Sequence, residues 1–390
     1  MPHTGQRWSL ILGGGAITLL AAGALARWHG VPSGVLAVAA RVAIAVGSDD
    51  WAEPPLRAIA YRPAVGAEEE LRVIEALEQL GGIAWRRLQS AEAEILLRRA
   101  LSMREQALPE PPIETLKLLG DALRDRRRYE EAASLYERAL ALRREAGGAK
   151  DPRVAGLLDS LAAVRRDQGR IADAEALYRE SLELREEVSD PGIAVTLAAL
   201  GSLYRGAGEL VRAELYFGRA LGHIDRIKET GWWPLRSRSD LSGLHAIVLA
   251  EVAALSLQRG RSKEAESLLA RSLSLARASH DPFAQARGLR LMATLEARRG
   301  NPSAAERHLR KALDAIPDAL GDHPRRAEIL LDLAALRQDE QRYRDAEDLL
   351  QQVERILRSS GPADDPALAQ VLARLAAVRL LDAQASAGRR

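Results

Sequence analysis

The chain of 390 residues is 47% apolar, 28% charged and only 4% aromatic, a balance that favours closely packed helices over sheets. It has no cysteine, which excludes a disulfide framework, a thiolate metal site and a cysteine nucleophile. Residues 1–48 carry three arginines and no acid, whereas residues 49–390 carry 53 basic and 54 acidic residues, so this near-neutral body disfavours phosphate-driven binding to nucleic acid.

An uncharged segment of nineteen residues runs from Trp8 to Ala26, and Trp28 follows just beyond Arg27. At a helical rise of about 1.5 Å per residue, the two tryptophans would lie roughly 30 Å apart, which matches the hydrocarbon core of a bilayer. We therefore expect residues 1–30 to be a single-pass membrane anchor, with Trp8 and Trp28 at the two interfaces.

Two other interpretations of this segment stay open. Ala24-Leu25-Ala26 has the small-x-small form of a signal-peptide cleavage site, so the segment could be removed after export. An acid-free start that carries arginine also resembles an organellar targeting sequence. The membrane would accordingly be a bacterial or an organellar inner membrane, and a short positive start before an apolar run favours a body outside the cytoplasm.

Residues 31–66 contain a second apolar stretch, Gly34 to Gly47, with Arg41 near its middle. It is short for a membrane span, and a charge at the centre of a bilayer is costly. We expect an interfacial helix or a helix packed on a partner subunit. The residues that follow are rich in proline and mixed in charge, and they predict a linker.

A pattern of a small residue, a large one four positions later and a small one three further recurs seven times after residue 66. The intervals between copies are 39, 42, 39, 52, 40 and 41 residues. The copies are Ala93/Leu97/Ala100, Ala132/Tyr136/Ala139, Ala174/Tyr178/Ser181, Ala213/Phe217/Ala220, Ala265/Leu269/Ser272, Ala305/Leu309/Ala312 and Ala346/Leu350/Val353. Small residues at these places indicate that another helix comes close.

A second helix is predicted upstream of each copy, because an apolar residue followed by a small one stands thirteen residues before each leading alanine, as in Leu119-Gly120. Asp-Pro pairs mark several joints between copies, where Asp can cap a helix and Pro suits its first turn. Glycines separate the two helices inside four copies, namely Gly169, Gly208, Gly260 and Gly300. Each copy is therefore predicted to be helix, tight turn, helix, loop.

This pattern resembles the tetratricopeptide repeat, whose signature includes a leucine-glycine pair in the first helix and small-xxx-aromatic spacing in the second. With RRYEEAASLYERALALRRE, the repeats look most like the kinesin-light-chain variety. The resemblance implies an all-α, right-handed solenoid with a concave face lined by first-helix side chains. We expect seven repeats over 67–363, an insertion at 223–240, a capping helix with a polar outer side at 364–384 and a tail at 385–390.

Catalytic and metal-binding motifs are not evident. The seven histidines show no zinc spacing, and the glycines at 13–15 lack a following Gly-Lys-Ser/Thr. Paired acids such as Glu130/Glu131 are typical of solvated helix surfaces. We expect neither an enzyme nor a cofactor or metal.

The resemblance places one row of side chains in the groove, and arginines dominate it. The row reads Trp85, Arg124, Arg166 and Arg205, with Asp125 and Asp167 beside the first two arginines. Stacked guanidinium groups suit an acidic or carboxylate-bearing partner. The alternative is that an arginine-rich protein scatters arginines everywhere and that the two aspartates neutralise the row.

The insertion between His223 and Asp240 contains adjacent tryptophans, Trp232 and Trp233, in a polar setting. Tryptophan is favoured at interfaces, so these two predict a contact with a partner or membrane. Packing back onto the solenoid is the alternative.

The sequence as a whole predicts a membrane-anchored scaffold that binds protein partners and lipid but no nucleic acid, as an assembly factor or accessory subunit of a membrane complex. An exported peptide-binding module without an anchor is the alternative. The layout also resembles that of the mitochondrial inner-membrane tetratricopeptide protein that assists respiratory complex III.

Overall fold

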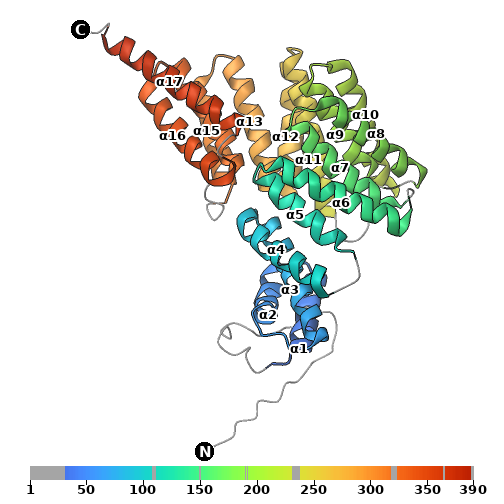
Figure 1. The fold of residues 1–390 in the computed structure, drawn as a ribbon. Helices are drawn as coiled ribbons and strands as arrows, with labels where there is room; N and C mark the ends of the chain where they lie inside the picture. The colour runs from blue at the N-terminus through green and yellow to red at the C-terminus, as the bar shows by residue number, and fades with distance from the viewer. Residues whose placement is uncertain are drawn as a thin grey trace, which may run out of the picture. The chain divides into compact units, whose positions relative to one another are not determined.

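The structure is a computed structural model, and it describes residues 31–107, 111–148, 151–188, 190, 192–230, 238–317, 323–362 and 365–387. These residues form helices and contain no strand, so the predicted all-α class is confirmed for them (Figure 1). The predicted anchor with Trp8 and Trp28, and the predicted contact residues Trp232 and Trp233, lie outside this described part.

The first compact unit ends at Ala76. Its helices are α1 (Ser33–Ala45), α2 (Asp49–Ala60) and the start of α3 (Ala67–Arg86). Helix α1 packs on α2, with Leu36 and Ile59 at 0% and 2% exposure. The Ser33 hydroxyl donates to Glu69 at 3.1 Å and accepts from Arg72 at 2.9 Å, which ties the start of α1 to α3.

Helix α2 occupies residues for which the sequence predicts a proline-rich linker, and that prediction is wrong for 49–60. The Ser48 side chain accepts a backbone N–H of the first turn and starts the helix. Pro54 and Pro55 remove two backbone donors, which normally breaks a helix. Pro55 is buried together with Leu56, however, so the packing of this face outweighs the lost hydrogen bonds.

The second compact unit runs from Leu77 to the end of the chain, and its described residues form seven helix pairs followed by one helix, as predicted. The pairs are α3/α4 (Ser90–Ala107), α5 (Ile113–Asp125)/α6 (Tyr129–Gly147), α7 (Pro152–Asp167)/α8 (Ile171–Glu187), α9 (Ile193–Gly206)/α10 (Leu210–Thr230), α11 (Arg238–Gln258)/α12 (Ser262–Ala278), α13 (Pro282–Arg298)/α14 (Pro302–Ala315) and α15 (Pro324–Asp339)/α16 (Tyr343–Ser360). The last helix is α17 (Pro366–Ala387).

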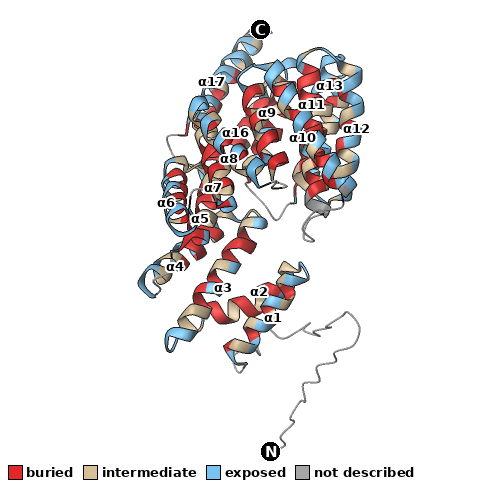
Figure 2. Ribbon diagram, turned by 90° about the vertical axis from the view of Figure 1, so that its right-hand side faces the viewer, coloured by how far each residue is buried: buried red, intermediate tan, exposed pale blue. Residues whose placement is uncertain are grey.

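Close approach of the paired helices explains the small residues in the pattern. The leading alanine of every copy is buried, and a Cβ added to Gly120 would lie 2.8 Å from the Tyr136 ring. The same test gives 2.6 Å between Gly201 and Phe217. Buried residues accordingly lie on the helix sides that face neighbouring helices (Figure 2).

The turns inside the pairs use a left-handed residue at one fixed position. The four predicted glycines, 169, 208, 260 and 300, all have φ between 75° and 79°. Leu88, Arg127 and Gln341 occupy the equivalent position in the remaining copies with φ of 62°, 59° and 60°. A side chain in this conformation is strained, so these three turns retain a side chain at a cost in backbone energy.

Aspartates cap helices at the joints between repeats, as the sequence predicts. Asp151 accepts the N–H of Arg153 at 2.9 Å, and Asp281 accepts those of the first residues of α13. His323 caps α15 by accepting the N–H of Arg325 on Nδ1 at 3.1 Å. These caps satisfy N–H groups that a helix start leaves without a backbone partner.

Two details differ from the sequence prediction. The first part of the insertion continues α10 as far as Thr230, and α11 already begins at Arg238. The predicted polar outer side of the capping helix is wrong, because α17 exposes Leu372, Leu380 and Leu381 at 39%, 60% and 39%.

Only one stretch of the described residues, Leu241–Gln258 in α11, is long and apolar enough to cross a membrane. It lies inside the repeats, and most of it is buried there. Its apolar character is that of a core helix of the solenoid.

Candidate protein-binding groove

The first helices of the pairs lie on the inner side of the array. Successive first helices contact each other from α5 to α13, whereas no contact of that extent joins successive second helices in the described residues. Helices that approach one another more closely lie on the inside of a curve. Side chains of α5, α7, α9, α11 and α13 therefore face the groove, as the resemblance implies.

The six residues predicted for the groove all lie near the carboxyl ends of first helices, and most of them are joined in a ladder. Trp85 Nε1 donates to Asp125 Oδ2 at 2.8 Å, and Arg124 Nε donates to Asp167 Oδ2 at 2.8 Å. In both cases a donor in one repeat meets an acid in the next. Arg166 donates to its own neighbour, Asp167, at 2.8 Å.

This geometry supports the alternative in which aspartates neutralise the arginine row. Burial alone would lower the pKa of Arg124, but the Asp167 carboxylate raises it above its ordinary value. Burial raises the pKa of Asp125, although Arg124 and the Trp85 hydrogen bond act in the opposite direction. The first part of the row is thus a set of mutually paired groups that also joins adjacent repeats.

The row of charged residues continues beyond Arg205 with residues that are not among those predicted from the sequence. Arg205 Nε donates to Glu251 of α11 at 2.9 Å, and Arg287 of α13 pairs with the same carboxylate. Arg290 pairs with Glu328 and donates to Asp332 at 2.7 Å. Arg287 and Arg290 lie nearer the amino end of their helix than the predicted row, and their i, i+3 spacing is the signal that could have revealed them.

Arginines outnumber acids by one on this second part of the groove, where Arg205, Arg287, Arg290 and Arg325 lie among Glu251, Glu328 and Asp332. The pKa of Arg287 falls to about 10, mainly through burial and then through Arg205 and Arg325. A third of its side chain still meets solvent, because the groove is open, so crowding by protein atoms causes this shift without complete exclusion of water. The Arg325 guanidinium lies over the Phe283 ring, 5.3 Å from its centroid.

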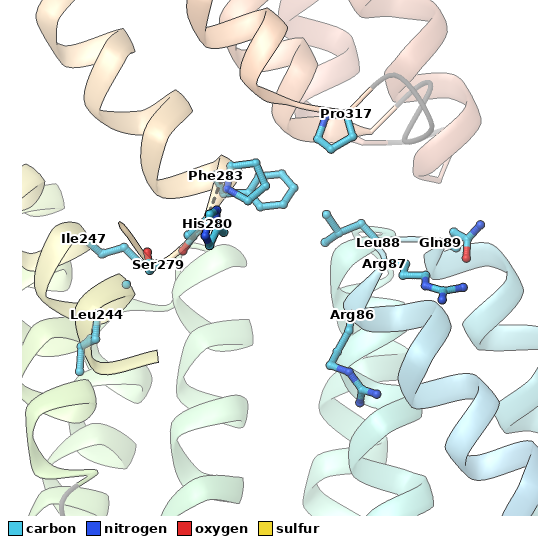
Figure 3. A pocket seen from close by; sticks show the side chains of 13 residues that line it. Arg86, Arg87, Leu88, Gln89, Leu244, Ile247, Ser279, His280, Phe283 and Pro317 are labelled. Carbon is cyan, nitrogen blue, oxygen red and sulfur yellow. Dashed lines mark hydrogen bonds between the residues drawn. The ribbon is translucent and has the colours of Figure 1, made fainter. Parts of the chain in front are cut away.

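A cavity of about 700 Å³ opens between the α3–α4 turn and the starts of α11 and α13 (Figure 3). The Leu88, Ile247 and Phe283 side chains line it, together with Pro317. Phe283 also lines a smaller space beside Arg287, Arg290 and Arg325. An apolar cavity therefore adjoins the guanidinium groups, which is the chemistry of a site for a ligand with both apolar and acidic groups.

The side chain of Leu88, the strained turn residue between α3 and α4, lines this cavity. Four other turns have glycine at the equivalent position, which would offer no side chain. In Figure 3 the Leu88 side chain faces the space across which Phe283 and Ile247 lie. No cluster of metal-ligating residues occurs in the described part of the chain.

Comparison with known proteins finds tetratricopeptide repeats in the middle part of the chain. A tetratricopeptide repeat model matches residues 112–187, 153–223 and 244–318. No match is found among curated proteins. The Rap conjugation gene regulator of plasmid pLS20, solved in complex with the Phr* peptide, is 14% identical with a TM-score of 0.59, covering 80% of this chain and 87% of that one.

Two further solved structures are similar to this chain. Aspartyl phosphate phosphatase F from Bacillus subtilis is 12% identical with a TM-score of 0.57, covering 80% of this chain and 76% of that one. A Podosopora anserina kinesin light chain protein with nearly identical repeats is 17% identical with a TM-score of 0.40, covering 53% of this chain and 96% of that one. At these identities the likeness concerns the fold.

Proposed function

We propose that this chain, which is built of tetratricopeptide repeats, is a scaffold that binds a segment of a partner protein in its inner groove and is tethered to a membrane by residues 8–26. The proposed role requires no catalytic step. It would assist the assembly of a membrane complex by holding partners at the bilayer, since tethering makes the next encounter effectively intramolecular.

The observation that carries the binding role is the cavity of about 700 Å³ beside the arginine cluster. Its volume exceeds that of any single side chain, so it suits several residues of an extended segment. Apolar side chains of that segment would meet Leu88, Ile247 and Phe283, and its carboxylates would meet the guanidinium groups next to Phe283. An acidic segment with apolar side chains therefore fits better than a basic one.

The fold similarity to a Rap regulator in complex with a peptide supports this role, because that protein has a peptide bound to the same kind of helical array. The chemistry of the bound segment follows from the groove of this chain and not from that peptide. The inner arginines that remain partly exposed, Arg166 and Arg205, would extend the contact along the row.

The membrane tether rests on the uncharged segment from Trp8 to Ala26. An exported module with a cleaved signal is the alternative, and sequencing of the mature amino terminus separates the two, because cleavage after Ala26 supports the module. Assembly or maintenance of respiratory complex III is a narrower alternative, which rests on the resemblance in layout to the mitochondrial inner-membrane tetratricopeptide protein. The partners that copurify would decide it.

Affinity purification from native membranes in mild detergent, followed by mass spectrometry, tests the binding role. Ile247 is 36% exposed in the cavity, so Ile247→Arg should remove the partner that the wild-type chain retains. Val211 is 77% exposed on α10, a second helix, so Val211→Arg is the matched control and should retain it. Equal recovery with both variants, at unchanged helix content, would contradict binding in this groove.

A further inference from the structure

Helix α1 has two apolar faces, and only one of them is used inside the first compact unit. Leu36, Ala40 and Ala43 are buried at 0%, 2% and 5%. On a neighbouring side of the helix Val35 and Val38 are 58% and 55% exposed, as is Val46 at 64%.

These valines form a continuous stripe. With half-buried Val42 they stand at spacings of three, four and four residues, which places all four on one side of an α-helix. We call Val35, Val38, Val42 and Val46 the valine face. A contiguous exposed apolar face is typical of a docking surface, whereas single exposed valines are ordinary.

The charge of helix α1 itself suits a lipid interface. Helix α1 contains no acid, and its one charged residue, Arg41, is exposed at the edge of the stripe, where its Nε donates to the Ala37 carbonyl at 3.4 Å. A long cationic side chain at such an edge can reach lipid phosphates while its stem covers apolar surface.

An exposed aromatic residue stands at one end of the stripe. Trp51 is 60% exposed and is the third residue of α2, which follows α1 after a short turn at Gly47 and Ser48. Chain connectivity keeps this indole near the Val46 end of α1. Tryptophan is enriched where an apolar surface meets the headgroups of a bilayer.

The short connection between the uncharged segment and α1 indicates which surface covers the valine face. The uncharged segment ends at Ala26, and only residues 27–32 separate it from Ser33. Six residues span at most about 20 Å, so a membrane-inserted segment 8–26 would hold α1 at the bilayer surface. A partner protein or a second copy would have to compete with lipid that is already within reach.

We propose that the valine face of α1 lies in the interface of the lipid bilayer, with Arg41 directed to the lipid phosphates. This inference rests on the proposed membrane tether. It adds a second membrane contact, which presses the first compact unit against the surface through the face that its own packing leaves unused. A single apolar segment would allow the unit to swing, whereas two contacts fix the direction of α1.

The absence of cysteine allows a direct test on the full chain. Val38→Cys places a polarity-sensitive fluorophore on the valine face, and Val211→Cys places it on a valine of α10 that is more exposed still, at 77% against 55%. Both proteins are reconstituted into vesicles of phosphatidylcholine and phosphatidylglycerol, with and without nitroxide-labelled acyl chains. Flotation of the vesicles reports the tether independently of the label.

The expected result is a shift of the label at position 38 to shorter wavelength in vesicles and its several-fold quenching by the nitroxide lipids, while the label at 211 is unchanged. A floating chain whose label at 38 behaves like that at 211 overturns the inference and leaves the tether standing. A chain that does not float overturns both. Crosslinking of position 38 between two chains, without lipid quenching, shows that a second copy covers the face and also overturns the inference.

Discussion

The fit of Gly201 against Phe217 allows a sharp test of how the paired helices pack. Gly201 lies in α9 and a Cβ at this position would be 2.6 Å from Phe217 Cδ1 and 2.7 Å from Cε1. Real contacts of this kind do not occur, and Phe217 is 0% exposed, so its ring has no solvent into which it can move. We therefore expect Gly201→Ala to force α9 and α10 apart.

The magnitude follows from two opposing terms. Overpacking a core by one methyl group costs about 1–3 kcal/mol. Replacing glycine by alanine inside a helix contributes about 1 kcal/mol in the other direction. The net destabilisation of the α9/α10 pair should thus be about 0–2 kcal/mol.

Gly218 is the matched control, because it neighbours Phe217 in α10 and a Cβ there meets nothing within 4 Å. Gly218→Ala has only the helix-propensity term and should stabilise the pair by about 0.5–1 kcal/mol. The two variants have the same composition, and they should move stability in opposite directions.

Urea unfolding followed by far-ultraviolet circular dichroism, combined with amide hydrogen exchange of α9 and α10, measures both effects. Exchange is needed because repeat arrays can unfold in parts, which blurs a single transition. The double variant Gly201→Ala/Phe217→Leu recreates the Ala/Leu pairing of the last three copies, for example Ala253 with Leu269, and should recover part of the loss. If Gly201→Ala is as stable as Gly218→Ala, the close-approach argument is wrong.

Three further predictions concern single ionisable groups. Arg127 forms two hydrogen bonds to Asp365, which is 3% exposed at the start of α17. Arg127→Gly should therefore speed amide exchange in the first turn of α17, even though glycine relieves the strain of the left-handed conformation. Unchanged exchange would contradict a stabilising pair. His323 has its pKa lowered to about 4 by burial and Arg325, so the neutral cap is favoured, and stability should fall as pH drops from about 6.5 towards 4, by up to about 3 kcal/mol. His323→Asn keeps a capping acceptor and should flatten this dependence in urea midpoints at pH 7 and pH 4.5; an equal slope would assign the loss to other groups. Asp167→Asn should leave the charge of Arg124 uncompensated. Calorimetry should then show an acidic peptide binding about fivefold more tightly, which is equivalent to about 1 kcal/mol. Weaker binding would show instead that Asp167 positions the arginine.

The repeats could be predicted from the sequence because their determinants are local. A helix pair needs small residues at fixed spacing where two backbones approach, and Gly120 opposite Tyr136 shows this directly. Turn glycines and Asp caps such as Asp281 act within a few residues of their own position. The predicted register of Trp85 and Arg124 on first helices follows from the same periodicity.

The non-glycine turns are a case where the sequence held a signal that only the structure explains. Leu88 and Arg127 stand where other copies have glycine, and the side chain of each faces a distant part of the chain. Leu88 faces the cavity near Phe283, and Arg127 reaches Asp365, 238 residues away. At Arg127 the hydrogen bonds of the side chain offset the strain of the turn.

The sequence by itself determined the helix pairs, their number in the described chain and their capping, since each depends on neighbours within one or two turns. Only the tertiary structure decided that Glu251 pairs with both Arg205 and Arg287, that a cavity forms beside them, and that α2 is helical despite two prolines. The curvature of the array sums small rotations between successive pairs, so residues far apart in sequence meet across the groove at places that no local spacing encodes.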